Sequence, residues 1–577
     1  METFQAIIEQ RLRAALDRSG LAPAGEVTPA ADARFGDYQT NAAMVLAKQR
    51  SENPRALAQK IVSVLDLADV AEPPQIAGPG FINFTIKNEA LAAKALEVLR
   101  DERLGVGLTA RSRKIVIDFG SPNVAKPMHV GHIRSTVLGD ALARIAHFLG
   151  HDVIRDNHIG DWGTQFGMVI WGWKHLLNRS ALQDDPIAEL VRIYKETNDR
   201  GSADEAVREQ CRQELVKLQA HDAENYAIWT ECVSLSLREF ESAYELLDIH
   251  YDLQRGESFY NDRLAAVVDR LLKSGIAEIS EGAVVVFFRD VPELADKPCI
   301  IRKRDGGYNY ATTDVATVDY RIQDLKRDTI WIVTGAPQIL HFRQIFEIAR
   351  REGYTADFRH ITNGSILGED RKLMKTRSGD NVPLRDVLEE AIARARKLVE
   401  QKNPEMADRE KNEIARTIGI GAVKYADLSQ YRMTDYVFSW DKMLSLHGNT
   451  APYLQNAYVR IRSIFRKLEG DAQSSLHPPH ATERVPPILA EPAERTLALR
   501  ICQFAEVLPT VLNDFRPNVL ANYLFELANS FHSFYEACPV LKADEPTRAS
   551  RLALADATGR LLRKGLELLG IKVPERM

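Results

Sequence analysis

The pattern of apolar and polar residues predicts a strand, a loop and a helix between residues 114 and 150. The segment KIVIDF is rich in β-branched residues, as buried parallel strands are. Beyond the loop, apolar residues recur at helical spacing from Ile133 to Leu149, and Gly150 supplies a stop. The segment DVIRDNHIGDWG then begins another strand. The pattern therefore predicts a β-loop-α-β unit.

The same kind of pattern divides the chain into four expected domains. Residues 1–108 form a small α/β domain, in which PPQIAGPGFINFTI is a strand bounded by Gly and Pro. Residues 109–365 alternate strands and helices, with a charged helical insertion at about 170–250. Residues 366–445 hold a cationic loop and the amphipathic helix VPLRDVLEEAIARARKLVEQKN, and residues 446–577 are helical throughout. The predicted fold class is α/β: a Rossmann-type parallel-sheet catalytic domain, an N-terminal α/β domain and a C-terminal all-α helical bundle.

Composition narrows the class of protein. The formal charge of −5 over 577 residues argues against indiscriminate nucleic-acid binding but allows a local basic surface. The five cysteines lie far apart, which indicates a reducing compartment and no zinc site. No apolar run approaches the roughly 20 residues that cross a bilayer, and the charged N-terminal segment is not a secretory signal. We expect a cytoplasmic protein that makes no contact with a membrane.

Two histidines, His129 and His132, flank Gly131 in the loop between the predicted strand and helix. Ligands bind beyond the ends of parallel strands, where a helix N-terminus offers N–H groups to a phosphate. The histidines have no Cys or acidic partner at metal-ligand spacing, so they suit a metal poorly. They suit phosphate oxygens better, because they can stabilise charge that spreads onto a transferring phosphoryl group. The plainer alternative is a pair of surface or capping histidines.

Three further segments each allow two interpretations. SILGEDRKLMKTRSGD, residues 365–380, is either a flexible loop for a leaving pyrophosphate or an ordinary solvated charged turn. Tyr310 and Asp314 share one helix face, and Asp314 either binds a guanidinium or is a carboxylate favoured by the helix dipole. APYLQNAYVRIRSIFRK interleaves aromatics with cations, as single-stranded RNA loops require, but amphipathic helices often look the same.

Together these segments resemble the class I aminoacyl-tRNA synthetases, and in detail the arginyl-tRNA synthetase family. The resemblance runs nearly end to end, and its most specific pieces are SPNVAKPMHVGHIRST, GDWGTQFG, TTDVA, MKTRSG, GAVKYADLS and NTAPYLQNAYVRI. It implies that ATP with Mg²⁺ activates L-arginine to arginyl-adenylate, which is transferred to the 3′-terminal ribose of tRNA(Arg). It also implies that activation requires bound tRNA, and that the protein is a monomer without a protein-bound metal.

The resemblance assigns residues to each substrate. The residues that match the ATP-binding positions are His129, Gly131, His132, Met374 and Thr376. Those that match positions around the arginine are Asp118, Ser121 and Asn123 at its α-amino end, and Tyr310, Asp314 and Gln338 at its guanidinium. Those that match tRNA contacts are Phe81 and Asn83 at the D-loop, and Tyr535 and Met577 near the anticodon. Pro539 stands where relatives can carry an aromatic residue.

The chain departs from the family in one signature. LMKTRSG replaces the K-M-S-K-S motif, and Thr376 stands in place of its second lysine. Relatives with the same gap look as though they supply the charge from a lysine just before H-x-G-H, which here is Lys126. We hypothesise that Lys126 reaches the same phosphates as His129 and His132, and that Lys375 and Arg377 assist. These five residues are the predicted catalytic set.

Three other functions are compatible with parts of the sequence. A synthetase for another amino acid would differ at Asp314. A small H-x-G-H nucleotidyltransferase would lack the N-terminal domain and the helical tail. A non-catalytic tRNA-binding relative would have no use for His129, His132, Tyr310 and Asp314 together.

Overall fold

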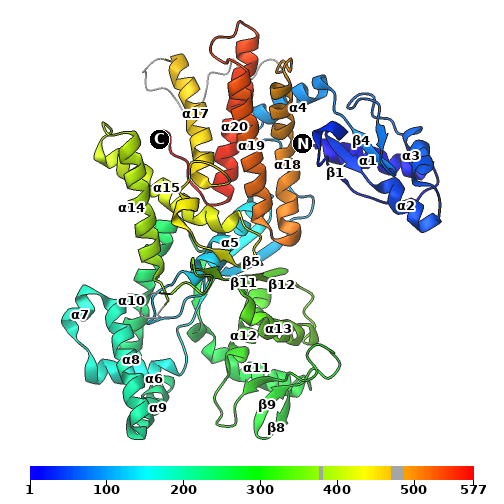
Figure 1. The fold of residues 1–577 in the computed structure, drawn as a ribbon. Helices are drawn as coiled ribbons and strands as arrows, with labels where there is room; N and C mark the ends of the chain where they lie inside the picture. Colours follow the sequence, from blue (N-terminus) through cyan, green and yellow to red (C-terminus); the bar gives the residue numbers. More distant parts are fainter. Residues whose placement is uncertain (376–380, 470–485) are drawn as a thin grey trace. The chain divides into compact units, whose positions relative to one another are not determined.

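The structure, a computed structural model, describes residues 1–375, 381–469 and 486–577. The chain folds as two compact units. One joins Met1–Thr109 to Ser445–Leu568 and Lys572–Met577, and the other comprises Ala110–Leu444 and Leu569–Ile571. The first unit contains an α/β N-terminal part and a helical C-terminal part, and the second contains a parallel sheet with helices (Figure 1). The predicted fold class is confirmed.

Five parallel strands form the central sheet of the second unit, in the order β12-β11-β5-β6-β7. Their bounds are Lys114–Phe119 (β5), Asp152–Ile159 (β6), Leu253–Gly256 (β7), Thr329–Gly335 (β11) and Asp357–Asn363 (β12). From β5 the chain adds strands first on one side and then, with β11, on the other. The order therefore reverses between β5 and β11, and such a switch point opens a crevice at the carboxyl ends of the strands.

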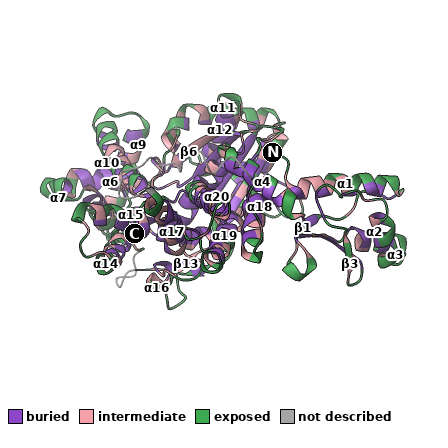
Figure 2. Cartoon of the chain, turned by 90° about the horizontal axis from the view of Figure 1, so that it is seen from above, coloured by how far each residue is buried: buried purple, intermediate pink, exposed green. Residues whose placement is uncertain are grey.

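The helices of this unit follow the predicted periodicity. Helix α5 spans Gly131–Phe148, and Gly150 follows it with a φ of 92°. Helix α14 spans Leu384–Lys402 and buries one apolar face, a division that the burial colours of Figure 2 follow. The other helices are α6 (Gln165–Leu176), α7 (Arg179–Asp184), α8 (Pro186–Ala203), α9 (Glu205–Gln219), α10 (Ala223–Leu247), α11 (Asn261–Lys273), α12 (Tyr310–Gln323), α13 (Ile339–Arg351), α15 (Asp408–Leu428) and α16 (Trp440–Met443).

Smaller sheets complete the second unit. Strand β9 lies in a three-stranded antiparallel sheet, and two residues each of β13 and β14 form a short parallel pair. The bounds are Glu278–Ser280 (β8), Ala283–Val286 (β9), Cys299–Arg302 (β10), Ile366–Leu367 (β13) and Tyr436–Val437 (β14). The charged insertion expected at about 170–250 consists of helices, as predicted.

The first unit begins with a four-stranded antiparallel sheet in the order β1-β2-β4-β3. Its elements are α1 (Phe4–Arg18), β1 (Val27–Pro29), β2 (Tyr38–Thr40), α2 (Ala42–Arg50), α3 (Pro54–Val62), β3 (Gln75–Ala77), β4 (Phe81–Phe84) and α4 (Asn88–Arg100). The single strand predicted in PPQIAGPGFINFTI is wrong, because this segment is the hairpin of β3 and β4. Gly78 and Gly80, with φ of 53° and 138°, allow its turn.

The helical part of the first unit packs on its N-terminal part. Its helices are α17 (Ala451–Glu469), α18 (Pro492–Asp514), α19 (Pro517–Ala537) and α20 (Thr547–Leu568). Arg495 of α18 binds the Asp37 carboxylate through two hydrogen bonds of 2.9 and 2.7 Å. Further along α18, Glu506 accepts a hydrogen bond of 3.0 Å from Tyr38. These polar contacts thus hold α18 against strand β2 and against Asp37, the residue before it.

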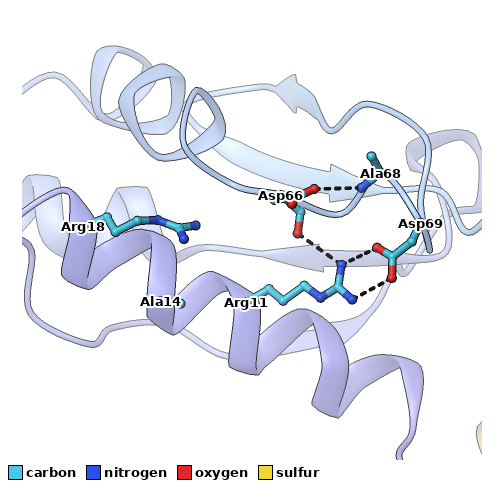
Figure 3. A pocket seen from close by; sticks show the side chains of 6 residues that line it. All are labelled: Arg11, Ala14, Arg18, Asp66, Ala68 and Asp69. Atoms are coloured by element: carbon cyan, nitrogen blue, oxygen red, sulfur yellow. Dashed lines mark hydrogen bonds and ion pairs between the residues drawn. The ribbon is translucent and has the colours of Figure 1, made fainter.

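A surface pocket of about 520 Å³ lies between α1 and residues 66–69 (Figure 3). The Arg11 guanidinium pairs with the Asp69 carboxylate, and Arg18 donates to the Val64 carbonyl at 2.7 Å. Both arginines therefore already have partners within the protein, and the lining of this pocket does not indicate a ligand. Among the residues that the structure describes, no helix is long and apolar enough to cross a membrane.

One buried guanidinium ties α12 to the central sheet. Arg321 is 1% exposed, and its Nη2 donates to Asp118 Oδ2 at 2.6 Å and to Asp156 Oδ2 at 2.8 Å. The two carboxylates lie on β5 and β6, the neighbouring strands. Burial alone lowers the pKa of Arg321, but the two carboxylates outweigh that effect and raise it. The arginine therefore stays charged and holds three elements together.

Replacing Arg321 by Met should lower the free energy of unfolding by about 3–5 kcal/mol, because two carboxylates would stay buried without a counter-charge. The midpoint of urea unfolding measures the loss. As a control, Arg263→Met removes a guanidinium that pairs with Asp324 at the surface, where the two side chains are 39% and 42% exposed. A surface pair of this kind contributes about 1 kcal/mol or less. Equal midpoints for the two variants would contradict a stabilising role of Arg321.

Candidate active site

Segments that are distant in sequence meet at the carboxyl edge of the parallel sheet. The loop after β5 carries the predicted histidines, and the segment after β6 carries GDWGTQFG. Two short helices follow β7 and β11, and they are η2 (Glu257–Tyr260) and η3 (Ala336–Gln338). The edge is the one that contains the switch point between β5 and β11. It is therefore the candidate active site.

His129 and His132 lie side by side where the loop enters α5, with ring centroids 4.0 Å apart. The backbone N–H of His129 donates to His132 Nδ1 at 3.1 Å, and that of Gly131 donates to His129 Nδ1 at 3.1 Å. A backbone N–H can only donate, so each Nδ1 accepts and the proton of each neutral ring lies on Nε2. Each imidazole therefore keeps an Nε2–H donor for a ligand.

The environment of the two rings keeps them neutral. Burial lowers the pKa of His129. Burial and the neighbouring His129 lower the pKa of His132 to about 3. A Cβ at Gly131 would lie 2.9 Å from two atoms of the His129 ring, so glycine lets this ring fold against the backbone. The pair is thus a fixed, uncharged hydrogen-bond donor set, as the phosphate hypothesis requires.

Backbone hydrogen bonds hold the loop that precedes the histidines. Val124 N–H donates to the Gly160 carbonyl at 3.0 Å, which joins the loop to the end of β6. Ala125 N–H donates at 3.0 Å to Ser236 Oγ on insertion helix α10. Lys126 is exposed, and its ammonium lies 5.7 Å from the centre of the Tyr194 ring on insertion helix α8. The insertion thus supports the loop that carries the predicted catalytic lysine.

The two signature segments are joined by backbone pairing. Val130 N–H donates to the Val382 carbonyl at 2.9 Å, and Leu384 N–H donates to the Met128 carbonyl at 2.9 Å. His129 lies between these bonds, opposite Pro383. The chain directly after the cationic segment therefore pairs with the histidine loop. The sequence pattern did not predict this pairing.

The cationic segment begins as a hairpin. Met374 N–H donates to the Ile366 carbonyl at 3.3 Å, and Lys375 pairs with Asn381. Thr376 and Arg377, which the sequence assigns to ATP binding and catalysis, lie outside the described residues. The position of Lys375 next to the histidine loop is compatible with its predicted role.

The residues expected at the α-amino end of the amino acid lie at the start of the histidine loop. Asp118 Oδ2 accepts from Arg321, and Asp118 Oδ1 accepts from the Ser121 hydroxyl at 3.2 Å. Ser121 N–H donates to the buried Asn157 side chain at 3.1 Å, and Asn123 is exposed. Because both Asp118 oxygens already accept hydrogen bonds, this carboxylate fixes the loop, and its contact with a substrate stays a prediction.

The residues of the predicted guanidinium set lie on α12 and η3. Tyr310 and Asp314 lie one turn apart on α12, and Gln338 is exposed at the end of η3. His341 Nε2 lies 2.6 Å from Asp314 Oδ2, and the centroid of its ring lies 4.9 Å from that of Tyr310. The structure thus places His341, which no motif singled out, against two of the three predicted residues.

A second carboxyl group lies close to Asp314. Burial, followed by the nearby charges of Asp314 and Asp161, raises the pKa of Glu257 to about 8. Asp161 in turn fixes the Glu257 turn, because it accepts from the N–H and the hydroxyl of Ser258 at 2.8 and 2.6 Å. Among the described residues, no Lys or Arg pairs with Glu257 or Asp314. Two carboxyl groups that influence each other and have no cation suit a cationic ligand.

The sequence analysis missed Glu257 and His341. They lie on η2 and α13, whereas Asp314 lies on α12, so long stretches of chain separate all three. Neither residue belongs to a short motif with a known spacing, so only the fold shows that they are neighbours of Asp314. The part of the chain that the structure describes contains no group of three or more His, Cys, Asp or Glu residues arranged to hold a metal ion.

The residues that the resemblance assigns to tRNA lie in the first unit. Phe81 is half-buried and Asn83 buried on β4, and Met577 is half-buried. Tyr535 of α19 is 37% exposed, with the Arg460 guanidinium 5.6 Å above its ring. An exposed aromatic ring beside a cation is a suitable surface for an unpaired base.

Part of the aromatic and cationic set on α17 has an internal role. Tyr458 is buried and donates to Glu575 Oε1 at 3.0 Å, and Arg462 pairs with the same carboxylate at 3.3 Å. Arg466 donates to the Glu575 carbonyl at 2.8 Å. These three side chains hold the C-terminal segment, so the interpretation of this helix as an RNA-binding surface does not extend to Tyr458.

Comparisons with known proteins match the whole length of the chain to one kind of enzyme. The family model described as "tRNA synthetases class I (R), catalytic domain" matches residues 95–440. The models "Arginyl tRNA synthetase N terminal domain" and "DALR anticodon binding domain" match residues 2–86 and 454–577. The three matches follow one another along the chain and cover both units.

Individual relatives are similar over the full length. An arginine–tRNA ligase of Synechococcus elongatus is 46% identical over 565 residues, which cover 96% of this chain and 95% of that protein. One of Chromobacterium violaceum is 44% identical over 584 residues and 100% of both chains. The crystal structure of arginyl-tRNA synthetase from Plasmodium falciparum aligns over 100% of both chains with a TM-score of 0.85 and 28% identity. A solved structure of the Thermus thermophilus arginyl-tRNA synthetase aligns equally completely, with a TM-score of 0.83 and 26% identity.

The two histidines should be neutral and protonated on Nε2 at pH 7, which ¹⁵N chemical shifts of histidine-labelled protein report. His132 should stay neutral when the pH is lowered to about 5, well below the ordinary histidine pKa of about 6.5. Its folded pKa of about 3 means that the unfolded chain takes up the proton first, so the free energy of unfolding should fall as the pH falls below about 6.5. An imidazolium signal from His132 at pH 6 would contradict this account.

Proposed function

The chain belongs to the class I arginyl-tRNA synthetases, and from this premise we propose which of its residues carry out the reaction. The reaction is the ATP-dependent ligation of arginine to tRNA(Arg). In the first step the arginine carboxylate attacks the α-phosphorus of ATP, a carboxyl–phosphate bond forms, and pyrophosphate leaves. In the second step a hydroxyl of the terminal ribose attacks the carbonyl carbon, loses its proton, and AMP leaves.

For the first step we propose that the histidine loop binds ATP. His129 and His132 donate their Nε2–H groups to phosphate oxygens, and Gly131, Met374 and Thr376 complete the nucleotide site. Two fixed, neutral donors can stabilise the negative charge that develops on the α-phosphate, without the cost of burying cations. Mg²⁺ bound to ATP supplies further positive charge at the phosphates.

We propose that Lys126, Lys375 and Arg377 stabilise the negative charge of the leaving pyrophosphate. Lys126 is exposed three residues before His129, so its flexible ammonium can reach the phosphates that the histidines bind. Lys375 pairs with Asn381, and the chain from Val382 to Leu384 pairs with the histidine loop. This pairing supports the proposal that Lys375 and Lys126 act on the same phosphates.

The pair of carboxyl groups at Asp314 and Glu257 is the observation that carries the proposal for arginine. The two groups have no cation among the described residues, and a planar guanidinium with five donors matches such a pair. Tyr310 lies one turn from Asp314 on α12, and Gln338 is assigned to the same ligand.

The α-amino end of arginine is assigned to the start of the histidine loop. Asn123 and Ser121 bind this end of the substrate in the proposal. Asp118 acts there chiefly by holding the loop, because its Oδ1 accepts from the Ser121 hydroxyl.

For tRNA we propose a division of labour between parts of the chain. Residues 1–108 contact the D-loop through Phe81 and Asn83, residues 109–365 and 366–445 perform the chemistry, and residues 446–577 read the anticodon. Tyr535 and Met577 lie on that anticodon-binding part. We further propose that the protein is a cytoplasmic monomer, in keeping with five cysteines that are free and buried.

The proposal is tested by ATP–pyrophosphate exchange with arginine, measured with and without a tRNA that carries an arginine anticodon. We expect exchange only when tRNA is present, because the family resemblance implies that tRNA gates activation. Exchange without tRNA would contradict the requirement for tRNA in activation, but it would still agree with an arginine–tRNA ligase. No exchange under either condition, with folded protein, would contradict the roles of His129 and His132.

Arginine binding should tighten as the pH rises from about 7 to about 9, because Glu257 loses its proton near pH 8 and then pairs with the guanidinium. The pH dependence of KM for arginine, measured with tRNA present, tests this. Glu257→Gln should weaken arginine binding and abolish the rise, while KM for ATP serves as the internal control. If KM for arginine depends on pH in the same way in Glu257→Gln and in the parent enzyme, the titrating group is not Glu257.

A further inference from the structure

His341 lies beside the arginine pocket and has no role in the proposal so far. It is the third residue of α13, which follows β11 and η3 at the switch point. Its Nε2 lies 2.6 Å from Asp314 Oδ2, and the two side chains are only 15% and 19% exposed. Because Asp314 is also the carboxylate assigned to the guanidinium, this contact affects the shape of the pocket itself.

The imidazole is held rigidly. Its ring centroid lies 4.9 Å from that of Tyr310 and 4.9 Å from that of Phe342. Aromatic contacts with both neighbours restrict the two side-chain torsions of His341, so the direction of its Nε2–H is set by packing. A donor whose direction is set in this way can determine the orientation of the group that accepts from it.

Asp314 needs such a donor. The terminal torsion of an aspartate is broad, so a carboxylate without partners samples many orientations. The hydrogen bond from His341 occupies Oδ2 and leaves Oδ1 for a ligand. Glu257 stands close enough for the charge of Asp314 to raise its pKa. Fixing Asp314 therefore fixes the orientation of the oxygen that remains for a ligand.

We propose that His341 is a positioning residue for the recognition of arginine: it holds Asp314 so that its free Oδ1 faces the ligand in one orientation. The inference rests on the proposed arginine site and deepens it. A carboxylate of fixed orientation suits the planar, directional donors of a guanidinium, whereas a compact ammonium with rotatable donors gains less from it. His341 thereby favours arginine over amino acids that end in an ammonium, such as lysine.

Two substitutions at His341 separate positioning from packing. His341→Phe keeps an aromatic ring and removes the donor, so it should raise KM for arginine roughly 10- to 100-fold, the effect of losing a hydrogen bond to a charged group. His341→Gln keeps an N–H donor at a similar distance from the backbone and should restore most of the affinity. In both variants kcat, KM for ATP and the thermal midpoint should stay at the parent values.

The matched control is His360→Gln. His360 lies on strand β12, bonds Thr334 Oγ1 at 2.7 Å and also packs on Phe342, but among the described residues it has no hydrogen bond with Asp314. This variant should leave KM for arginine unchanged. In an Asp314→Ala background, His341→Phe should have no further effect on arginine, because a positioning residue acts only through its partner.

Three results would overturn the role of His341: an unchanged KM for arginine in His341→Phe, a parallel loss in KM for ATP and kcat, or additive effects with Asp314→Ala. Selectivity provides a further readout, since lysine-dependent exchange relative to arginine-dependent exchange should increase in His341→Phe. These outcomes differ from a failure of the proposed function, in which the parent enzyme itself would show no arginine-dependent exchange.

Discussion

The charge cluster of Arg321 with Asp118 and Asp156 is the interaction on which the catalytic unit depends. It ties α12 to β5 and β6, and these elements lead to different parts of the site. Strand β5 continues into the histidine loop, whereas the other end of α12 carries Tyr310 and Asp314. Separating the guanidinium from its partners would leave buried charge unpaired. The spacing between the histidine loop and the end of α12 that carries Asp314 is therefore fixed largely by the buried Arg321 guanidinium.

The two halves of the site differ in charge for the same physical reason. Burial disfavours ionisation, so it lowers the pKa of His129 and His132 and raises that of Glu257. The histidines become neutral donors, which suit phosphate oxygens that arrive with their own cation. The Glu257 carboxyl group, with its raised pKa, stays protonated near pH 7 until a bound cation favours its ionised form. Low exposure to water therefore leaves neutral hydrogen-bond donors at one end of the crevice and a carboxyl group with a raised pKa at the other.

The sequence predicted those features that depend on local spacing. Strand β5, helix α5 and the loop between them follow from the apolar periodicity, and the four-residue separation of Tyr310 and Asp314 places both on one face of α12. Contacts between distant segments could not be predicted in this way. No local pattern shows that Arg321 bonds Asp118. The hairpin of β3 and β4 was missed because its turn depends on the positive φ of two glycines rather than on a change in hydrophobicity.

The helical insertion shows why charge content alone is a poor guide to the role of a segment. Many charged residues are typical of solvated helices, yet Ser236 accepts a hydrogen bond from the loop at Ala125, and the ring of Tyr194 lies near the ammonium of Lys126. The loop is held by its backbone N–H groups, so its side chains stay available to a ligand. The same holds where the Val382 carbonyl accepts from Val130. Support through the backbone leaves the side chains of Lys126 and the histidines available to a ligand, while other elements determine where the loop lies.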